Sequence, residues 1–183
     1  LGIMLPTTPL HVELFRNLHV DALVMTSGNG NDEPICRGNR EAVNRLGKLA
    51  DVFLLHDRDV VRRVDDSVVR STEMGPVIVR RSRGWVPEPL SIPVSTPESV
   101  LAVGGHLQVT ACLAVGNEAF PSQHIGDLDT VDARAFHREV IDGLLEFMEV
   151  QPQCVVVDPH PDYPSLLAGQ ELAQKFDARL IPV

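Results

Sequence analysis

Four prolines fall within residues 87–97, near the middle of the chain, and serine and threonine occupy much of the space between them. Proline fixes φ and has no N–H to donate, so it is rare inside helices and in the central strands of sheets. We therefore interpret residues 88–98 as an interdomain linker. This interpretation predicts two domains, at residues 1–93 and 94–183.

Before the linker, short apolar runs alternate with stretches whose apolar residues recur at helical spacing. Alternation of this kind favours an α/β sheet. We predict helices at 9–18 and 40–49 and strands at 1–6, 20–25, 52–55 and 77–79.

After the linker, the sequence predicts two strands joined by a short turn, at 100–105 and 110–115, and then a tight hairpin turn at 116–118 before a third strand at 119–122. Such a start, with glycines in its first turn, is typical of phosphate-binding domains of the actin and sugar-kinase type. The remaining predicted elements are a helix at 132–150, a buried strand at 154–157, a helix beginning at 171–176 and a strand at 179–183.

The composition limits the function classes. With 183 residues and 44% apolar content the chain can bury a core, and its net charge of −9 argues against nucleic acids or membrane surfaces as partners. We expect small molecules and proteins instead. The three cysteines form no CxxC pair, which fits a reducing cytoplasm, and no apolar run is long enough to span a bilayer. The sequence starts in one apolar run and ends in another, so we expect a fragment.

The first candidate site lies where an apolar run ends in Thr26, Ser27, Gly28 and Asn29. Hydroxyls, a side-chain amide and open backbone N–H groups at the carboxyl end of a strand are suited to an anion or nucleotide. The competing interpretation is an ordinary turn, because glycine and asparagine also supply the positive φ that turns require.

A second candidate site combines acidic and basic residues. Asp65, Asp66 and Ser67 could point into a ligand pocket, although a solvated turn with ion pairs is the alternative. Arg81 and Arg83 stand out on an acidic chain and suit an anion with several oxygens, with an exposed basic patch as the competitor.

The second half offers candidates near three turns. Gly104 and Gly105 follow a predicted strand, and His124 and Asp127 flank a further glycine. That histidine and aspartate could orient a substrate or contribute to a metal site, but a structural histidine is as common. His160 lies in a rigid run of aspartate, proline and tyrosine after another strand, at the strand end where α/β proteins place their sites.

These motifs give the chain a resemblance to the HypF-type carbamoyltransferases of nickel-iron hydrogenase maturation. The resemblance covers nearly the whole chain, in the family's order, through residues 2–6, 9–11, 25–29 with 33–34, 54–58, 63–70, 80–87, 122–128 and 158–163. It implies the later part of a YrdC-like twisted α/β sheet up to about residue 93. The opening part of an actin/sugar-kinase-like domain, similar to the tRNA threonylcarbamoyl transferases, would follow it.

The resemblance also implies an activity. In the family, carbamoyl phosphate and ATP yield carbamoyl adenylate, and the carbamoyl group passes to the carboxy-terminal cysteine of the partner HypE as a source of cyanide ligands. Zinc and a further divalent metal belong to parts of the family outside this chain, so we expect no metal ligands here. The fragment is expected to be inactive by itself.

By this resemblance, two sets of residues carry the chemistry. The phosphates would be bound by Thr26, Ser27, Asn29, Ser67, Arg81 and Arg83, with Asp65 and Asp66 orienting arginines. The adenylate would be received near Gly104, Gly105, His124, Asp127 and His160, which position the substrate.

The chain departs from the family pattern at two places that it contains. Asn31 and Asp32 replace a Ser-Gly pair, and Gln108 and Val109 replace Lys-Asn, which puts one hydroxyl contact and one phosphate contact in doubt. A standalone nucleotide-binding or interaction module is therefore the first alternative function. A tRNA-modifying threonylcarbamoyl enzyme is the second, although the acidic charge counts against it.

Overall fold

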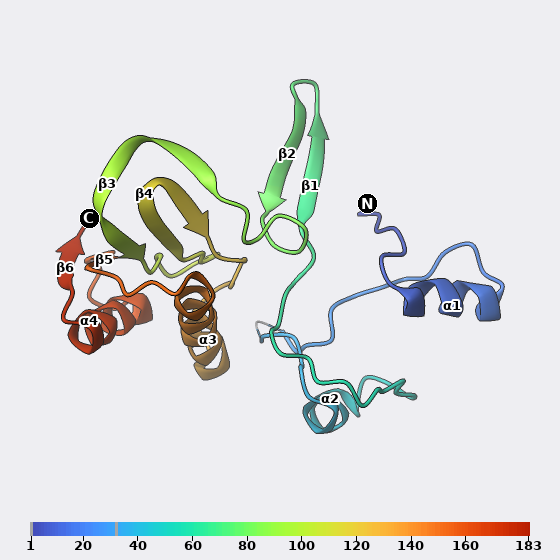
Figure 1. The fold of residues 1–183 in the computed structure, drawn as a ribbon. Coiled ribbons are helices and arrows are strands. Elements are labelled where there is room, and N and C mark those ends of the chain that lie inside the picture. Colours follow the sequence, from blue (N-terminus) through green and yellow to red (C-terminus); the bar gives the residue numbers. More distant parts are fainter. Residues whose placement is uncertain (1, 32) are drawn as a thin grey trace.

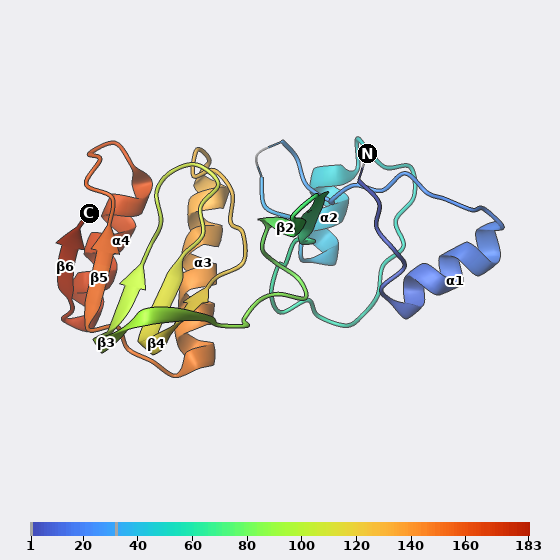
Figure 2. The ribbon, with the colours of Figure 1, turned by 90° about the horizontal axis from the view of Figure 1, so that it is seen from above.

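The computed structural model describes residues 2–31 and 33–183, so the predictions that involve Leu1 and Asp32 lie partly outside the described residues. Figures 1 and 2 show two parts of different character. The second half forms a sheet covered by helices, while the first half is an open arrangement of short elements joined by long loops.

The second half contains a four-stranded mixed sheet in the order β4-β3-β5-β6. Its strands are β3 (Leu90–Ala102), β4 (Cys112–Pro121), β5 (Cys154–Val157) and β6 (Arg179–Pro182). The pair β3 and β4 is antiparallel, whereas β5 runs parallel to both β3 and β6. Both views place α3 (Val131–Met148) and α4 (Pro164–Phe176) on the same face of this sheet.

The core lies between that face and the two helices. The apolar residues of α3 recur at helical spacing and so form one buried stripe against the sheet. The buried cluster consists of Leu101, Val103, Val109, Ala111, Leu113, Ile125, Leu128, Phe136, Ile141, Leu144, Leu145, Val155, Val157, Leu172 and Ala173. Burial of this one continuous cluster stabilises the second half.

The first half contains α1 (Pro9–Leu18), α2 (Asn39–Leu46) and a hairpin of β1 (Val68–Thr72) and β2 (Gly75–Arg80). Helix α1 begins where the Thr8 side chain accepts a hydrogen bond from the His11 backbone N–H, and proline occupies its first turn. It ends at His19, whose φ of 52° is left-handed. No residue of α1 is buried, and Figures 1 and 2 show it extending away from the second half.

Three strands predicted in the first half are wrong. The described residues of 1–6, 20–25 and 52–55 form no strand, and Leu54 keeps 69% of its surface exposed. A strand requires a neighbouring strand to accept and donate its backbone hydrogen bonds, and no strand pairing among the described residues includes these segments. The predicted strand at 77–79 is confirmed as part of β2.

The expectation that residues 88–98 hold no central strand is also wrong, because residues 90–102 form β3, the longest of the described strands. Its pairing with β4 is interrupted between Ser91 and Thr96 and again between Thr96 and Val100, the two intervals that contain Pro93 and Pro97. The strand therefore accommodates proline at irregular positions, where the missing N–H breaks no ladder bond. The domain boundary at residues 93 and 94, which falls inside this strand, stays a prediction.

The hairpin turn predicted at 116–118 is wrong as well. Gly116 pairs with Thr96 and Glu118 pairs with Ser91, so the predicted turn and the predicted third strand both belong to β4. The predicted helix at 132–150 and the strands at 154–157 and 179–183 are confirmed. Helix α4 begins earlier than predicted, at Pro164, because proline is favoured in the first turn of a helix.

Candidate functional site

Ser67 organises the segment that carries the predicted arginines. Its hydroxyl donates to the Arg83 carbonyl oxygen at 2.8 Å and accepts from the Ser82 backbone N–H at 2.9 Å. The Arg83 guanidinium donates to the Val64 carbonyl oxygen at 2.8 Å, and its Nε lies 3.7 Å from an Asp66 carboxylate oxygen. Asp66 thus lies beside the arginine that it was predicted to orient. Asp65 contributes its carbonyl oxygen, which accepts from the Arg83 backbone N–H.

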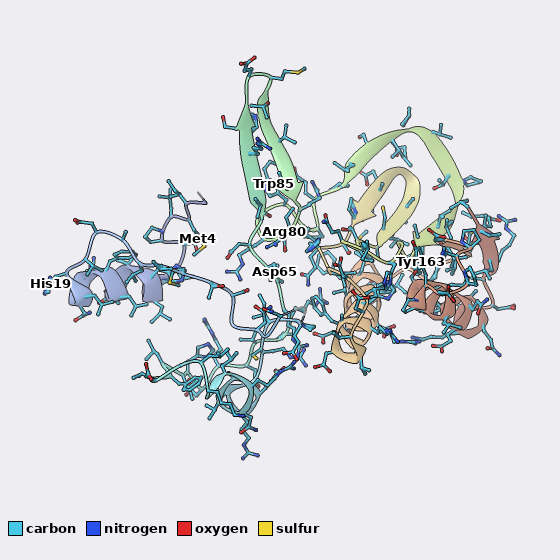
Figure 3. All side chains as sticks on the ribbon, turned by 180° about the vertical axis from the view of Figure 1, so that it is seen from behind. Met4, His19, Asp65, Arg80, Trp85 and Tyr163 are labelled. Atoms are coloured by element: carbon cyan, nitrogen blue, oxygen red, sulfur yellow. The ribbon has the colours of Figure 1, made fainter. Side chains whose placement is uncertain are left out.

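Arg81 has a buried donor that makes no hydrogen bond to a described residue. Its Nη2 donates to the Glu88 carbonyl oxygen at 2.6 Å, while its Nε is buried and has no hydrogen-bond partner among the described residues. A buried donor without an acceptor is costly, so this position favours a ligand that supplies an oxygen. Figure 3 shows the same region, where Asp65 and Arg80 lie at the base of the β1–β2 hairpin and Trp85 lies close by.

The glycine-rich turn lies apart from these arginines in its hydrogen bonding. The Asn29 side chain donates to the carbonyl oxygens of Gly30 and Glu33, so it closes its own turn. Thr26 and Ser27 are exposed. Within residues 2–31 and 33–183, no hydrogen bond joins this turn to Ser67, Arg81 or Arg83. The structure therefore does not bring the first predicted set together by direct contact.

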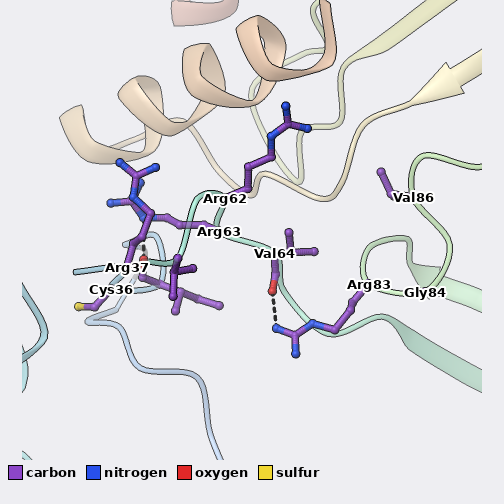
Figure 4. A pocket seen from close by; sticks show the side chains of 10 residues that line it. Cys36, Arg37, Arg62, Arg63, Val64, Arg83, Gly84 and Val86 are labelled. Atoms are coloured by element: carbon purple, nitrogen blue, oxygen red, sulfur yellow. Dashed lines mark hydrogen bonds between the residues drawn. The ribbon is translucent and has the colours of Figure 1, made fainter. Parts of the chain in front are cut away.

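A cavity that the sequence analysis did not identify lies within the first half of the chain, because all its lining residues fall between residues 35 and 86. Its volume is about 460 Å³, and four arginines contribute to its wall (Figure 4). The lining residues are Ile35, Cys36, Arg37, Val60, Arg62, Arg63, Val64, Arg83, Gly84 and Val86. The available sequence signal was the high density of arginine at 58–63 and 80–83 on an acidic chain, but only spatial proximity makes these residues one surface.

Cys36 lines this cavity but is not activated. Burial, followed by the nearby Glu41 carboxylate, raises the pKa of its thiol. A nucleophilic cysteine needs the opposite shift, because the thiolate is the reactive form. Cys36 is therefore a neutral wall residue at pH 7.

In the second half, Gly104 and Gly105 begin the turn after β3, and they have different roles. Gly104 has φ of +82°, and a Cβ there would lie 2.7 Å from a Val109 methyl carbon and 2.8 Å from the Thr110 carbonyl oxygen. It is required by the backbone. A Cβ on Gly105 would meet nothing within 4 Å, so Gly105 leaves open space at the carboxyl end of the strand.

Asp127 and His124 lie near this turn but form no hydrogen bond with each other in the described part of the chain. The Asp127 carboxylate accepts from the Gln108 backbone N–H at 2.6 Å, which fixes the glycine turn. Burial, and then the positive charge of Arg80, lowers the pKa of His124, so its ring is neutral at pH 7. Its backbone N–H donates to the Arg81 carbonyl oxygen at 3.0 Å and links the two predicted sites.

A stack of three rings connects His160 to the glycine turn. Tyr163 stacks on His160, with ring centroids 4.2 Å apart, and on His106, at 5.1 Å. His106 Nε2 lies 3.1 Å from an Asp129 carboxylate oxygen, while its Nδ1 is buried without a described partner. Figure 3 places Tyr163 within the second half. The sequence analysis missed His106, Asp129 and the role of Tyr163, because their proximity depends on two turns 50 residues apart.

Two groups of predicted residues are thus assembled. Ser67, Arg81 and Arg83 form one group with the backbone of His124, and the turn at 104–108 gathers Asp127 and His160 into the other. Hydroxyl, guanidinium and imidazole groups can bind and orient an anionic substrate, but none of the residues in these two groups forms a nucleophile–base pair. In the described residues no three histidine, cysteine, aspartate or glutamate side chains are grouped as a metal site. Nor does any described helix combine the length and apolarity needed to cross a bilayer.

Two family models match the chain, one in each half. Residues 1–82 match the model described as telomere recombination, of the Sua5, YciO and YrdC type, and residues 95–183 match the HypF Kae1-like domain. Together with the fold, these matches define the class. It is an α/β protein in which a YrdC-like part precedes a Kae1-like part.

Curated relatives and solved structures agree on one family. The chain is 43% identical over 162 residues to the carbamoyltransferase HypF of Synechocystis, with 88% of the chain covered, and 35% identical over 184 residues to a probable carbamoyltransferase HypF of Methanocaldococcus jannaschii, with 100% covered. It spans only 21% and 24% of their lengths. The chain belongs to the HypF family, as a segment of these longer proteins.

Two solved structures resemble the model. A crystal structure of full-length HypF in a phosphate- and nucleotide-bound form superposes with a TM-score of 0.88 at 41% identity, covering 100% of this chain and 28% of that one. The structure of HypF from T. kodakarensis gives 0.80 at 36% identity, covering 87% and 21%. At these identities the likeness extends beyond the general fold.

Proposed function

We propose that the protein to which this chain belongs is the carbamoyltransferase of hydrogenase maturation. It uses carbamoyl phosphate and ATP to form carbamoyl adenylate and transfers the carbamoyl group to the carboxy-terminal cysteine of a HypE-type acceptor, as the source of cyanide ligands. One observation carries this proposal, namely that YrdC-like and Kae1-like matches stand in one chain in the order found in proteins named carbamoyltransferase HypF. We place the activity in the cytoplasm.

The first half supplies the groups for adenylation. Adenylation brings a carbamate and ATP together, so two anions must be held close while pyrophosphate leaves. The free Nε donor of Arg81 and the Arg83 guanidinium are suited to phosphate oxygens, and the Thr26 and Ser27 hydroxyls are exposed for a further contact. Ser67 has a positioning role, since its hydroxyl holds the backbone of the arginine segment.

The second half supplies the groups that receive the adenylate. Gly105 leaves room at the end of β3, and His106, oriented by Asp129, has a buried Nδ1 that makes no hydrogen bond to a described residue. His124, Asp127 and His160 shape this space and position the guest. Each of these roles concerns binding and orientation.

The alternative of a non-catalytic module of the same fold rests on Gln108 and Val109. Val109 is 2% exposed and packs in the core, and the Gln108 backbone is held by Asp127. Val109 therefore serves the core, and Gln108, an exposed residue, holds the turn through its backbone. Neither position by itself argues that the chemistry is lost. A tRNA threonylcarbamoyl enzyme is disfavoured by the net charge of −9.

The deciding experiment is carbamoyl-phosphate-dependent exchange of pyrophosphate into ATP by a full-length protein that carries this sequence. We expect exchange above the level without carbamoyl phosphate. If exchange is absent while a HypE-type protein still binds, the enzymatic function is wrong and the binding module is favoured.

One substitution tests whether Arg83 contacts the nucleotide. Arg83→Ala should weaken ATP binding by about tenfold, because it removes a charged hydrogen-bond donor. Arg70→Ala, which removes an exposed arginine from β1 of the same hairpin, is the matched control. Unchanged ATP affinity in Arg83→Ala would remove Arg83 from the site.

A further inference from the structure

Arginines of the first half meet a single carboxylate on α3. Arg63 Nη1 lies 2.6 Å from Glu139 Oε2, and Arg37 Nη1 lies 2.9 Å from Glu139 Oε1. Both oxygens of Glu139 are therefore engaged, each by a different arginine from another part of the sequence. Arg63 and Glu139 are 76 positions apart.

Arg63 is the centre of this contact. Its side chain is only 16% exposed, and its Nε donates to the Ile35 carbonyl oxygen at 2.7 Å. Its Nη2 lies 3.4 Å from Glu41 on α2, and its guanidinium carbon is 6.0 Å from the centroid of the Phe136 ring. One side chain thus joins a loop, α2 and α3. A planar guanidinium can satisfy several acceptors at once, whereas a lysine ammonium cannot match this geometry.

Two more arginines extend the contact along α3. Arg45 lies 2.9 Å from Asp132 at the start of the helix, and Arg62 lies over the Phe147 ring, 5.9 Å from its centroid, near the end. Arg62 also approaches the place where Gly143 has no side chain, since a Cβ there would lie 3.6 Å from the guanidinium. Figure 4 shows Arg37, Arg62 and Arg63 gathered beside the pale orange helix.

The electrostatics of the contact are complementary. Burial acts to raise the pKa of Glu41, but the backbone N–H groups of Arg37 and Gly38 and the Arg63 guanidinium hold that pKa below its ordinary value. Glu41 is therefore ionised at pH 7 and places a negative charge beside Arg63. Removal of Glu139 would leave Arg37 and Arg63 close together without their shared counter-charge, which costs more than loss of an exposed pair.

The same contact borders both groups of site residues. Arg37 and Arg63 line the cavity that also contains Arg83, and the Gln123 side chain donates to the Arg63 carbonyl oxygen. The adjacent His124 N–H donates to the Arg81 carbonyl oxygen. Any shift of Arg63 relative to α3 therefore moves the adenylating residues relative to the receiving ones.

We propose that Arg63, through Glu139, is a positioning residue that holds the arginine-lined cavity against the second half during carbamoyl transfer. This inference rests on the proposed function. In productive transfer the acceptor sulfur bonds to the carbamoyl carbon, the bond from that carbon to the AMP oxygen breaks, and the thiol proton is released. If the halves separate, water attacks the same carbon and yields AMP and carbamate, so the adenylate is lost without transfer.

The test uses a full-length protein that carries this sequence, with a HypE-type acceptor. Glu139→Gln, which keeps the side-chain size and lies outside the cavity wall, should leave pyrophosphate exchange within about twofold of wild type but raise AMP released per carbamoyl group transferred by about tenfold. Arg63→Ala should raise the same ratio. The double variant should show less than the sum of the two single effects, because the two residues share one ion pair although each also has contacts of its own. Arg63→Lys should restore only part of the coupling.

Arg138→Ala is the matched control, since Arg138 is on the same helix but pairs with Glu171 inside the second half. It should keep the wild-type ratio of AMP to transferred carbamoyl. Wild-type ratios in Glu139→Gln and Arg63→Ala would overturn the inference and leave the proposed function intact. An equal loss of exchange and transfer would also overturn it, because Arg63 would then serve adenylation or folding. Absence of exchange in the wild type would instead overturn the proposed function.

Discussion

The two halves of the chain differ greatly in how far their apolar residues are buried. In the second half, Leu101 is fully buried within a sheet covered by α3 and α4. In the first half, Leu54 belongs to an equally apolar run, yet most of its surface is exposed, and Ser82 is the only described residue before β3 that is buried. The difference teaches that an apolar run becomes a strand only where another strand is present beside it.

The two halves also differ in the kind of contact that holds their elements in place. Second-half elements pack through apolar side chains, whereas the first half meets α3 through arginines and carboxylates. Ion pairs at a partly exposed surface fix the relative position of the two elements that they join, but they add little to the free energy of unfolding. The first half is thus positioned by its contacts more than it is stabilised by them.

Hydrogen exchange should give the largest contrast between the halves. Amides of β3 that pair with β5, such as Val100 to Ala102, should exchange slower than those of residues 20–25 by on the order of a hundredfold or more, because the latter form no described backbone hydrogen bonds. Mass spectrometry or NMR would measure this. Equal rates in the two segments would break the comparison.

Truncation of one leucine in each half should give the next largest difference, in the free energy of unfolding. Leu101→Ala should lower the free energy of unfolding of the second half by about 3 kcal/mol, since it leaves a cavity in the core. Leu54→Ala should change it by less than about 0.5 kcal/mol because its side chain is mostly exposed. Denaturant unfolding followed by circular dichroism measures both changes. A large loss in Leu54→Ala would mean that its segment is covered in solution.

Packing density within the second half can be tested at a glycine. A Cβ on Gly169 of α4 would overlap a Val157 methyl carbon, so Gly169→Ala should cost about 1–2 kcal/mol despite the higher helix propensity of alanine. Gly105→Ala, where a Cβ meets nothing, serves as the control and should leave the thermal midpoint nearly unchanged. A stabilised Gly169→Ala variant would show that β5 and α4 are loosely packed.

The smallest effect concerns pH. His137 is buried on α3 and its Nε2 donates to the Val103 carbonyl oxygen at 2.8 Å, and burial lowers the pKa of its ring. Its contribution to stability is therefore complete above about pH 6.5, the unfolded value, and is lost as pH falls from there through the lowered folded pKa. The loss should reach about 1.4 kcal/mol per pH unit at most.

His137→Gln tests whether His137 causes this pH dependence of stability. Glutamine retains an N–H donor but does not titrate, so the variant should show a shallower decrease of stability between pH 6.5 and pH 5 in denaturant titrations. A residual slope is expected from His124, whose pKa burial also lowers. An unchanged slope in the variant would show that His137 is not the group responsible.

Local patterns predicted the helices well. The predicted helices at 9–18 and 132–150 are confirmed because helical spacing is a property of one segment and its own hydrogen bonds. The predicted strands at 20–25 and 52–55 were wrong because pairing depends on residues far away in the sequence. The strand in the proline-rich segment was not predicted for the same reason, because β4 supplies the pairing that keeps β3 extended.

The candidate site was predictable only in part. Residue chemistry pointed to Arg81, Arg83 and His160, and their roles stay predictions. Nothing in the local sequence could show that Arg63 reaches Glu139, or that His106 and His160 stack on the two faces of Tyr163. Those contacts connect segments that are distant in the chain, so they exist only once the sheet and helices are formed.

By itself, the sequence determined the helical periodicities, the acidic charge and the ordered motifs that place the chain in the HypF family. The tertiary structure alone decided which apolar runs are covered and which arginines share a carboxylate. The physical reason is the distance along the sequence over which each interaction acts. Helical hydrogen bonds act within a few residues, whereas strand pairing, burial and ion pairing depend on what the folded chain brings alongside.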